Sequence, residues 1–357
     1  MLFMDWKSNL KRLYPVFLVL LVFIVWKWRS SNSQQLPLVE FSGLTMGTIG
    51  YNVKYFDAEA RDFSQEIDSL LKVWNLSLST YIPESEISRF NKGLDCFEFE
   101  SEYFYPVLKA SSKVFEQSNG AFDPTVGPLV NAWGFGPEKS MLPDSSVVDS
   151  LRMLVGFDKI NFNENEVCKS NPGSQLDFSA VAKGYAVDVV ADYLESYGIE
   201  NLLVEIGGEL LCKGTKNDDQ PWRTAIEDPT VAVYERDYLA VVNLRNKAVA
   251  TSGNYRNYYV KDGVKYAHTL DPKSGFPISH RLLSASVFAG NCMEADAYAT
   301  AFMVLGLEKS KEILANNPEL DAYLIYSKED GEIGTFITDG IAPNIESVKA
   351  DEEESGG

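Results

Sequence analysis

The chain has 357 residues, of which 32 are basic and 51 acidic, giving a net charge of −19. So acidic a surface repels nucleic acid, and no basic stripe in the sequence offsets that repulsion. The hydrophobic content of 45%, with 12% aromatic residues, predicts a folded globule in one large domain or two closely packed ones. With only two histidines in the chain, a metal site built of several histidines is excluded.

The N-terminal residues indicate a membrane anchor. Residues 1–12 are polar and basic, and residues 13–26 are apolar and uncharged. This apolar run is shorter than the roughly 20 residues that span a bilayer, so it suits a signal-peptide core or a marginal anchor. Because no small-residue cleavage site and no lipid-accepting cysteine follow, we expect residues 13–28 to be an uncleaved anchor. The alternative, a buried core helix, does not suit a terminal segment with basic flanks.

Composition divides the rest of the chain into three parts. We expect a polar linker over residues 29–40, a globular domain over residues 41–343 and a disordered acidic tail over residues 344–357.

Periodicity predicts the elements of the first half of the domain. We expect a strand pair over 41–56 turning near 47–50, then helices over 57–75, 85–91, 103–118 and 147–155, and short strands within 157–178. The stretch 120–137 is punctuated by glycine and proline and rich in aromatics, so we expect a long functional loop.

The second half alternates mainly between strands and turns. We expect strands over 201–206, 209–213, 222–227, 238–244, 248–251, 258–260, 283–288, 322–326 and 334–337, and helices over 294–305 and 307–316. Few helices among many short strands predict an α+β fold with a largely antiparallel sheet.

The stretch around Lys183 is central to the prediction. An apolar run ends at Asp177, Ser179 is placed to cap a helix, and Gly198 is placed to end it. A lysine in the first turns of such a helix, beside Gly184, suits binding of an anionic ligand. The alternative is a helix of small residues packed on a sheet, with Lys183 in solvent.

The four cysteines are scattered and form no pair with the spacing of a zinc site. We expect mainly buried thiols, with one disulfide possible if the globule is exported. They are Cys96, Cys168, Cys212 and Cys292.

Several short motifs occur in a characteristic order. They are Met46-Gly47-Thr48, Ser79-Thr80-Tyr81, the segment 120–129 (GAFDPTVGPL), the segment 176–188 (LDFSAVAKGYAVD), the segment 268–277 (HTLDPKSGFP) and the segment 294–300 (EADAYAT). In this order they resemble the FAD:protein FMN transferases, the ApbE family, over residues 41–341. The resemblance implies an ApbE-like fold related to the tunnelling fold.

The resemblance also implies a binding site for FAD. The positions that match the family's flavin-nucleotide contacts are Met46, Tyr81, Gly120, Ala121, Phe122, Asp177, Lys183 and Thr269.

Asp296 and Thr300 are candidate metal ligands. They are four residues apart on a predicted helix and therefore share a face, and their hard oxygen donors suit magnesium. The alternative is an acid near a helix start with a threonine bonded to its own helix. The resemblance implies Mg²⁺ held by Asp296, Thr300 and the backbone carbonyl of Ala180.

His268 is the candidate catalytic base, since a histidine titrates near neutral pH and can take a proton from a hydroxyl. A loop histidine bonding locally is the alternative. The resemblance implies the catalytic role, whereas His280 matches no motif.

The implied activity is flavinylation of a protein. The FMN part of FAD would pass to a threonine or serine hydroxyl of a target flavoprotein, with release of AMP and dependence on Mg²⁺. The acceptor would carry a Ser/Thr-Gly/Ala-Ala-Thr motif, as in subunits of membrane redox pumps, on the periplasmic side of a bacterial inner membrane. Hydrolysis of FAD to FMN and AMP, and flavin binding or trafficking without turnover, are the alternatives.

Overall fold

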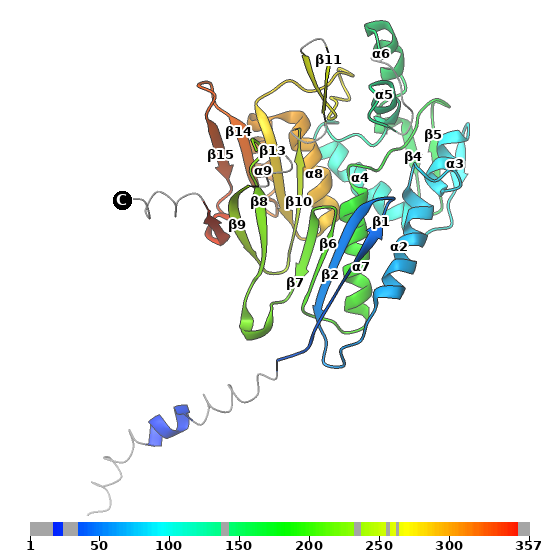
Figure 1. The fold of residues 1–357 in the computed structure, drawn as a ribbon. Coiled ribbons are helices and arrows are strands. Elements are labelled where there is room, and N and C mark those ends of the chain that lie inside the picture. The colour runs from blue at the N-terminus through cyan, green and yellow to red at the C-terminus, as the bar shows by residue number, and fades with distance from the viewer. Residues whose placement is uncertain are drawn as a thin grey trace, which may run out of the picture.

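The computed structural model describes residues 17–23, 35–136, 143–231, 237–254, 258–261 and 264–348. Within these residues, eight strands form one sheet in which every neighbouring pair is antiparallel (Figure 1). Across the sheet they are β1 (Leu38–Thr45), β2 (Ile49–Phe56), β6 (Leu202–Ile206), β7 (Glu209–Lys213), β10 (Lys247–Gly253), β13 (Leu282–Ala289), β14 (Asp321–Ser327) and β15 (Ile333–Ile337).

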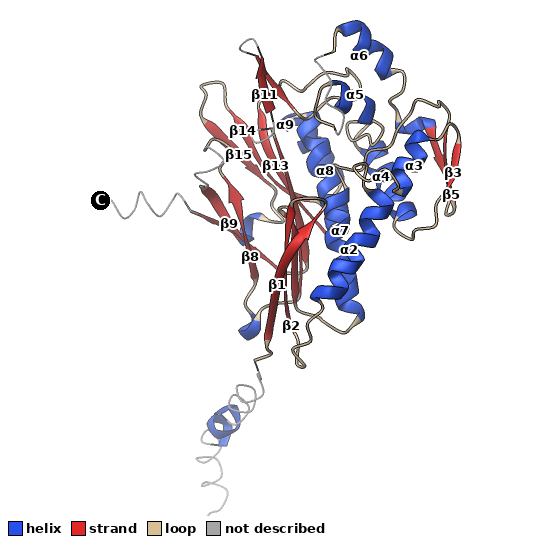
Figure 2. Cartoon of the chain, turned by 45° about the vertical axis from the view of Figure 1, so that its right-hand side comes forward, coloured by secondary structure: helices blue, strands red, loops and turns tan. Residues whose placement is uncertain are grey.

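Helices cover one face of this sheet, and a smaller sheet covers part of the other, so the molecule has three layers (Figure 2). The helices with assigned labels are α2 (Ser64–Leu78), α3 (Glu86–Lys92), α4 (Phe104–Gln117), α5 (Gly127–Ala132), α6 (Ser145–Arg152), α7 (Ala182–Ser196), α8 (Cys292–Leu305) and α9 (Leu307–Asn316). Of these, α2, α7, α8 and α9 contact the main sheet directly. The smaller sheet has the order β16 (Ile345–Ser347), β9 (Tyr238–Leu244) and β8 (Trp222–Glu227).

Two further small sheets lie outside these layers. One has the order β3 (Cys96–Glu98), β5 (Glu166–Lys169) and β4 (Ile160–Phe162), and the other pairs β11 (Tyr258–Lys261) with β12 (Val264–Ala267).

Alternation along the strands divides the core between the two faces of the main sheet. In β2, Tyr51, Val53 and Tyr55 are buried toward the helices, whereas Asn52 is exposed on the opposite face. Strand β6 is buried almost throughout, since Val204 packs in the helix-side core and Leu203 in the core beneath the smaller sheet. A strand covered on both faces reads as a continuous apolar run rather than an alternating one.

The predicted α+β class with antiparallel sheets is confirmed, and several local predictions were wrong. The helix expected from residue 57 begins at Ser64, because the Asp57 carboxylate accepts bonds from the Arg61 backbone and side chain at 2.8–2.9 Å in a preceding turn. The expected loop 120–137 contains α5. Strands β1 and β16 extend the fold beyond the predicted domain limits at both ends.

The N-terminal prediction is largely outside the described residues. Residues 17–23 are helical, but the remainder of the expected anchor at 13–28 is not described. No helix in the described part of the chain has the length and apolar character needed to cross a bilayer. Most of the expected acidic tail, residues 349–357, is also outside the described part.

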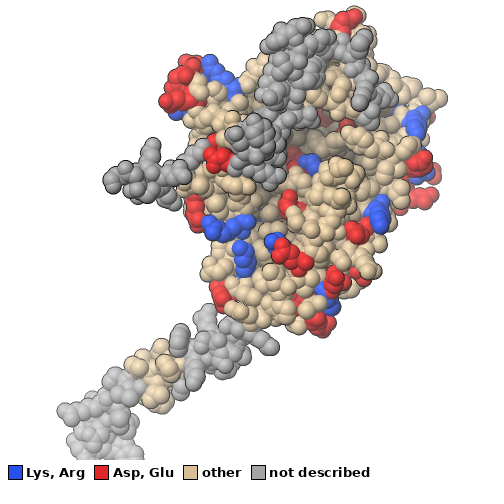
Figure 3. Space-filling model, viewed as in Figure 1, with Lys and Arg blue, Asp and Glu red and all other residues tan. Residues whose placement is uncertain are grey.

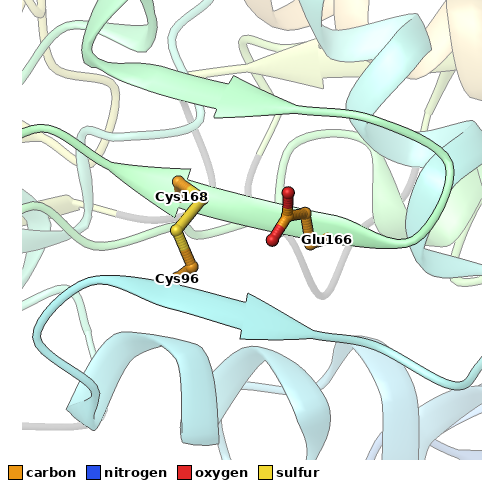
Figure 4. A group of neighbouring side chains, drawn as sticks. All are labelled: Cys96, Glu166 and Cys168. Carbon is orange, nitrogen blue, oxygen red and sulfur yellow. A yellow bond between two sulfur atoms is a disulfide. The ribbon is translucent and has the colours of Figure 1, made fainter.

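A disulfide joins Cys96 in β3 to Cys168 in β5, where the two strands pair residue against residue (Figure 4). Both sulfurs are committed to this bond, so the neighbouring Glu166 does not complete a metal site with them. Cys212 and Cys292 are buried free thiols, as expected of core cysteines.

The disulfide closes a loop with a sequence separation of 72 residues and should stabilise the fold by restricting the unfolded chain. We expect Cys96→Ser/Cys168→Ser to lower the free energy of unfolding by about 2–4 kcal/mol. Denaturant titration with and without reductant measures the effect. The wild type should weaken in reductant and the double variant should not; equal curves for all four samples would contradict a stabilising disulfide.

Candidate active site

A cavity of about 1880 Å³ opens at the end of the main sheet where the β1–β2 and β6–β7 turns lie. Figure 3 shows this face of the molecule hollowed, with basic and acidic side chains gathered in and around the hollow. Segments far apart in the chain meet here. Its lining includes residues of 46–49, 79–82, 121–124, 177–183, 207–210, 251–253 and 268–270, together with Asp296 and Thr300 of α8.

The close contact of α7 with α8 determines the geometry of the cavity wall. A side chain at Gly184 would bring a Cβ atom to 2.2 Å from the Cys292 carbonyl oxygen, so only glycine permits this approach. At the same point the Gly184 N–H donates to Oδ2 of Asp296 at 3.0 Å. The contact therefore aligns the Asp296 carboxylate with the first turn of α7.

Asp188, one turn further along α7, holds the start of α8. Its carboxylate oxygens accept the backbone N–H groups of Cys292 and Met293 at 2.7 and 2.8 Å. Asn291 caps the same helix by accepting the Glu294 N–H at 2.8 Å. Burial raises the pKa of Asp188 to about 7, although the two N–H bonds oppose that rise. Two helices are thus locked together directly behind the cavity.

Three charged groups face one another at the centre of the site. The Lys183 ammonium donates to Oε1 of Glu209 and lies 3.9 Å from Oδ1 of Asp296. Burial alone would lower the pKa of Lys183, but the two carboxylates outweigh burial and hold the pKa above its usual value. Burial raises the pKa of Glu209 to about 7, with Lys183 acting against that rise. Lys183 is therefore a fixed cation in the cavity, and its solvated alternative is wrong.

The donor set around Asp296 fits a magnesium ion. Asp296 and Thr300 lie one turn apart on α8 and line the cavity with Ala180, which precedes α7. Carboxylate, hydroxyl and backbone carbonyl are all hard oxygen donors. In addition, Oε2 of Glu209 is buried without a hydrogen-bond partner, so the site has acceptor capacity to spare.

Met46 and Tyr81, which the family resemblance assigned to flavin binding, lie on the cavity wall. Met46 has a φ of 47°, a left-handed conformation that costs a residue other than glycine roughly 1 kcal/mol or more. Strain of this kind is typical of functional turns. Tyr81 is 67% exposed, so its ring is accessible for stacking on an aromatic ligand.

Residues 120–122, which follow α4, do not all lie in the cavity as expected. Ala121 and Phe122 line the cavity, but Phe122 is 2% exposed and its side chain belongs to the core. Gly120 lines a separate, smaller depression next to Lys273 instead. Asp123, which was not among the predicted residues, borders both hollows.

Asp177 lines the cavity, but the residues after it do not form the predicted cap. The Asp177 carboxylate accepts bonds from both the backbone and hydroxyl of Ser179, at 2.8 and 2.5 Å. This turn delays α7, which begins at Ala182 with Val181 as its N-cap residue. Ser179 is therefore not the N-cap, whereas Gly198, with a φ of 81°, follows the helix end as predicted.

His268 and Thr269 line the cavity opposite α8. The His268 ring packs edge-on against Phe135, with ring centroids 6.3 Å apart. The loop that follows is fastened by Trp133, whose indole N–H donates to the Gly275 carbonyl at 2.8 Å. His280 is outside the cavity and bonds the Met303 carbonyl at 2.7 Å, in agreement with its having matched no motif.

Sequence reasoning missed Glu209 and the glycine pair 207–208 beside it. The two glycines form the β6–β7 turn, both with positive φ values, and Glu209 is the first residue of β7. A glycine pair followed by an acid between two apolar strands was a detectable signal. The motif was interpreted as an ordinary hairpin turn, because the sequence does not reveal that Lys183 faces Glu209.

The site unites a fixed ammonium group, a cluster of hard oxygen donors and an accessible aromatic ring in one large cavity. Groups of these kinds suit the binding of an anionic ligand that carries an aromatic ring.

The comparisons with known proteins agree. The model of the ApbE family matches residues 46–324, and the chain belongs to that family. The FAD:protein FMN transferase of Vibrio cholerae is 42% identical over 300 residues, covering 82% of this chain and 89% of its own. That of Escherichia coli K12 is 36% identical over 305 residues, covering 83% and 86%.

Solved structures show the same fold. The flavin transferase ApbE from Vibrio cholerae aligns with a TM-score of 0.78 at 38% identity, covering 87% of this chain and 99% of that one. The apo form of Pseudomonas stutzeri flavinyl transferase ApbE aligns with a TM-score of 0.77 at 36% identity, covering 87% and 97%. The family expected from the sequence is confirmed.

Gly184→Ala tests the role of the helix contact. The added methyl group must push α7 from α8, which should destabilise the fold by about 1–3 kcal/mol and misplace Asp296. Thermal melting and Mg²⁺-dependent flavin affinity measure the two effects. Gly290→Ala, just before α8, is the control because a Cβ there meets nothing within 4 Å. Wild-type values for both variants would contradict the assigned role.

Proposed function

We propose that this protein transfers the FMN part of FAD to a threonine or serine hydroxyl of an acceptor flavoprotein and releases AMP. The relatives named FAD:protein FMN transferase support this activity. The observation that carries it is that one cavity is lined by residues from three separate segments, namely Lys183, His268, and Asp296 with Thr300.

Asp296, Thr300 and the Ala180 carbonyl would hold Mg²⁺. When bound, the ion would neutralise negative charge on the diphosphate of FAD. Lys183 supplies a second positive charge that Glu209 and Asp296 keep in place. The protein thus contributes mainly position and electrostatics.

His268 would take the proton from the acceptor hydroxyl. The hydroxyl oxygen then bonds to the FMN-side phosphorus, and the bond from that phosphorus to the bridging oxygen breaks. AMP leaves with the bridging oxygen, and FMN remains on the acceptor through a phosphoester. The ring of Tyr81 and the 121–122 backbone would hold the flavin nucleotide during this step.

Incubation with FAD, Mg²⁺ and an acceptor domain carrying the Ser/Thr-Gly/Ala-Ala-Thr motif tests the activity. Mass spectrometry should show one FMN phosphoester added to the acceptor. Free FMN without modified acceptor would identify an FAD hydrolase instead, and unchanged FAD would identify a binding or trafficking protein.

Asp296→Ala should reduce transfer by orders of magnitude, because the site loses its charged metal ligand beside a doubly negative diphosphate. Asp296→Asn should resemble the alanine variant, since the charge is what matters. Thr300→Val is the milder comparison, because water can replace a neutral ligand. The measurement is initial transfer rate against Mg²⁺ concentration. Near-wild-type turnover by Asp296→Ala at limiting Mg²⁺, or transfer undiminished by a chelator, would overturn the metal assignment.

We also propose that residues 13–28 anchor the protein in the inner membrane with its catalytic domain in the periplasm. The apolar run between basic flanks supports an anchor. The Cys96–Cys168 disulfide supports an oxidising compartment, because disulfides are rare in the cytosol.

The full-length protein should sediment with membranes, and a truncated protein that begins at Gln34 should be soluble and retain transfer activity. Cell fractionation followed by mass determination of the mature protein measures both. Recovery of a native soluble form that lacks about its first thirty residues would indicate cleavage and contradict the anchor proposal.

A further inference from the structure

The cavity has a second arm on the far side of the β6–β7 turn. Its floor is the outer face of β2 and β6, represented by Asn52, Lys54 and Glu205, and its wall is strand β8. We call this arm the β8 groove. The smaller sheet covers β6 but ends at β8, so the outer face of β2 is covered at Phe56, which packs on Trp222, and left exposed at Asn52.

The size of the cavity exceeds what a nucleotide needs. Sites for small ligands usually enclose about 300–1000 Å³, whereas this cavity encloses about 1880 Å³. The region around Lys183 and Asp296 is one end of it. The β8 groove is continuous with that end, over the turn at Gly207 and Gly208. A second substrate therefore has room beside the first.

Strand β8 presents an open edge to this groove. It is the last strand of its sheet, and in the described part of the chain no strand pairs with its outer edge. Its middle residues, Thr224 and Ala225, have short side chains that leave the backbone accessible. Open edges are normally blocked by bulges, prolines or charged side chains, because they recruit other strands.

The direction of β8 leads into the active site. At one end, Trp222 packs on Phe56 and its indole N–H donates to the Lys213 carbonyl, both far from the β6–β7 turn. From there β8 runs toward Glu227, and residues along the strand, Trp222 and Glu227 included, line the same cavity as the turn. A chain laid along this edge would therefore reach the cavity that holds Lys183.

The floor of the groove suits a polypeptide rather than an apolar ligand. Asn52 donates to Oε2 of Glu205 at 2.6 Å, and Lys54 pairs with Glu40 at 2.6 Å. Such a floor is polar, and its side chains are already engaged in hydrogen bonds or an ion pair. It can accommodate many side chains, while main-chain hydrogen bonds to the strand edge would supply the affinity.

We propose that the acceptor polypeptide binds in the β8 groove as an added strand along β8 and so delivers its hydroxyl to the cavity. The proposal rests on the transferase activity proposed above and identifies where its protein substrate binds. Strand addition explains how one enzyme can modify flavoproteins that share only a short motif, since backbone pairing is largely independent of sequence.

Asn52→Trp, which fills the floor of the groove, is the test. The KM for the acceptor domain should rise by about tenfold or more, with kcat and FAD affinity within about twofold of the wild type, because only acceptor binding is lost. Ala225→Trp, on the wall of the groove, should raise the KM for the acceptor domain in the same way. Thr335→Trp is the matched control, since Thr335 is exposed on β15, the opposite edge of the main sheet, outside the cavity.

Wild-type acceptor KM values for both groove variants would overturn the proposal, as would a rise in the FAD KM, which would assign the groove to FAD. Failure of the wild type to modify the acceptor would instead contradict the proposed function. As a check independent of kinetics, Ala225→Cys carrying a benzophenone group should cross-link to the acceptor domain on irradiation, and Thr335→Cys should not. Cross-linking from Thr335→Cys alone would also overturn the proposal.

Discussion

The site depends on one contact, the approach of α7 to α8 at Gly184. There the helices are so close that a backbone N–H of one bonds the Asp296 side chain of the other. Asp188 fastens the same pair of helices by capping α8. A carboxylate and an ammonium group from two helices far apart in the sequence thereby come to face one cavity. If the contact loosened, Lys183 would stay on α7 and Asp296 on α8, but the two side chains would no longer be held close together.

The site buries three charged side chains, and burying a charge is energetically unfavourable. Removing Lys183, Glu209 and Asp296 from water costs several kcal/mol per ion, and their mutual attraction offsets only part of that cost. Such a cluster contributes little to stability, so its value lies in function. The cluster sets one ammonium group against two carboxylates, and the partnerless oxygen of Glu209 leaves room for one further donor or cation. The fold elsewhere supplies the stability, in two apolar cores on either side of the main sheet.

Much of this was accessible from the sequence, because strands and amphipathic helices have regular periods. Spacing alone placed Asp296 and Thr300 on one helix face, and family resemblance added Ala180 and His268. The sequence could not reveal the features of the site that depend on tertiary contacts. In the sequence Glu209 looks like any other residue of a strand, and only the folded structure shows that it pairs with Lys183. The start of α2 and the cap of α7 were misjudged because aspartates bond locally to the backbone, which competes with helix formation.

The most direct measurement of the central claim is an anomalous diffraction map from crystals soaked with Mn²⁺ and FAD. Manganese accepts the same hard oxygen donors as magnesium and can be located by its anomalous signal. The account predicts a peak bonded to Asp296, Thr300 and the Ala180 carbonyl, with the FAD diphosphate beside Lys183. A peak elsewhere, or a diphosphate bound away from the α7–α8 contact, would contradict it.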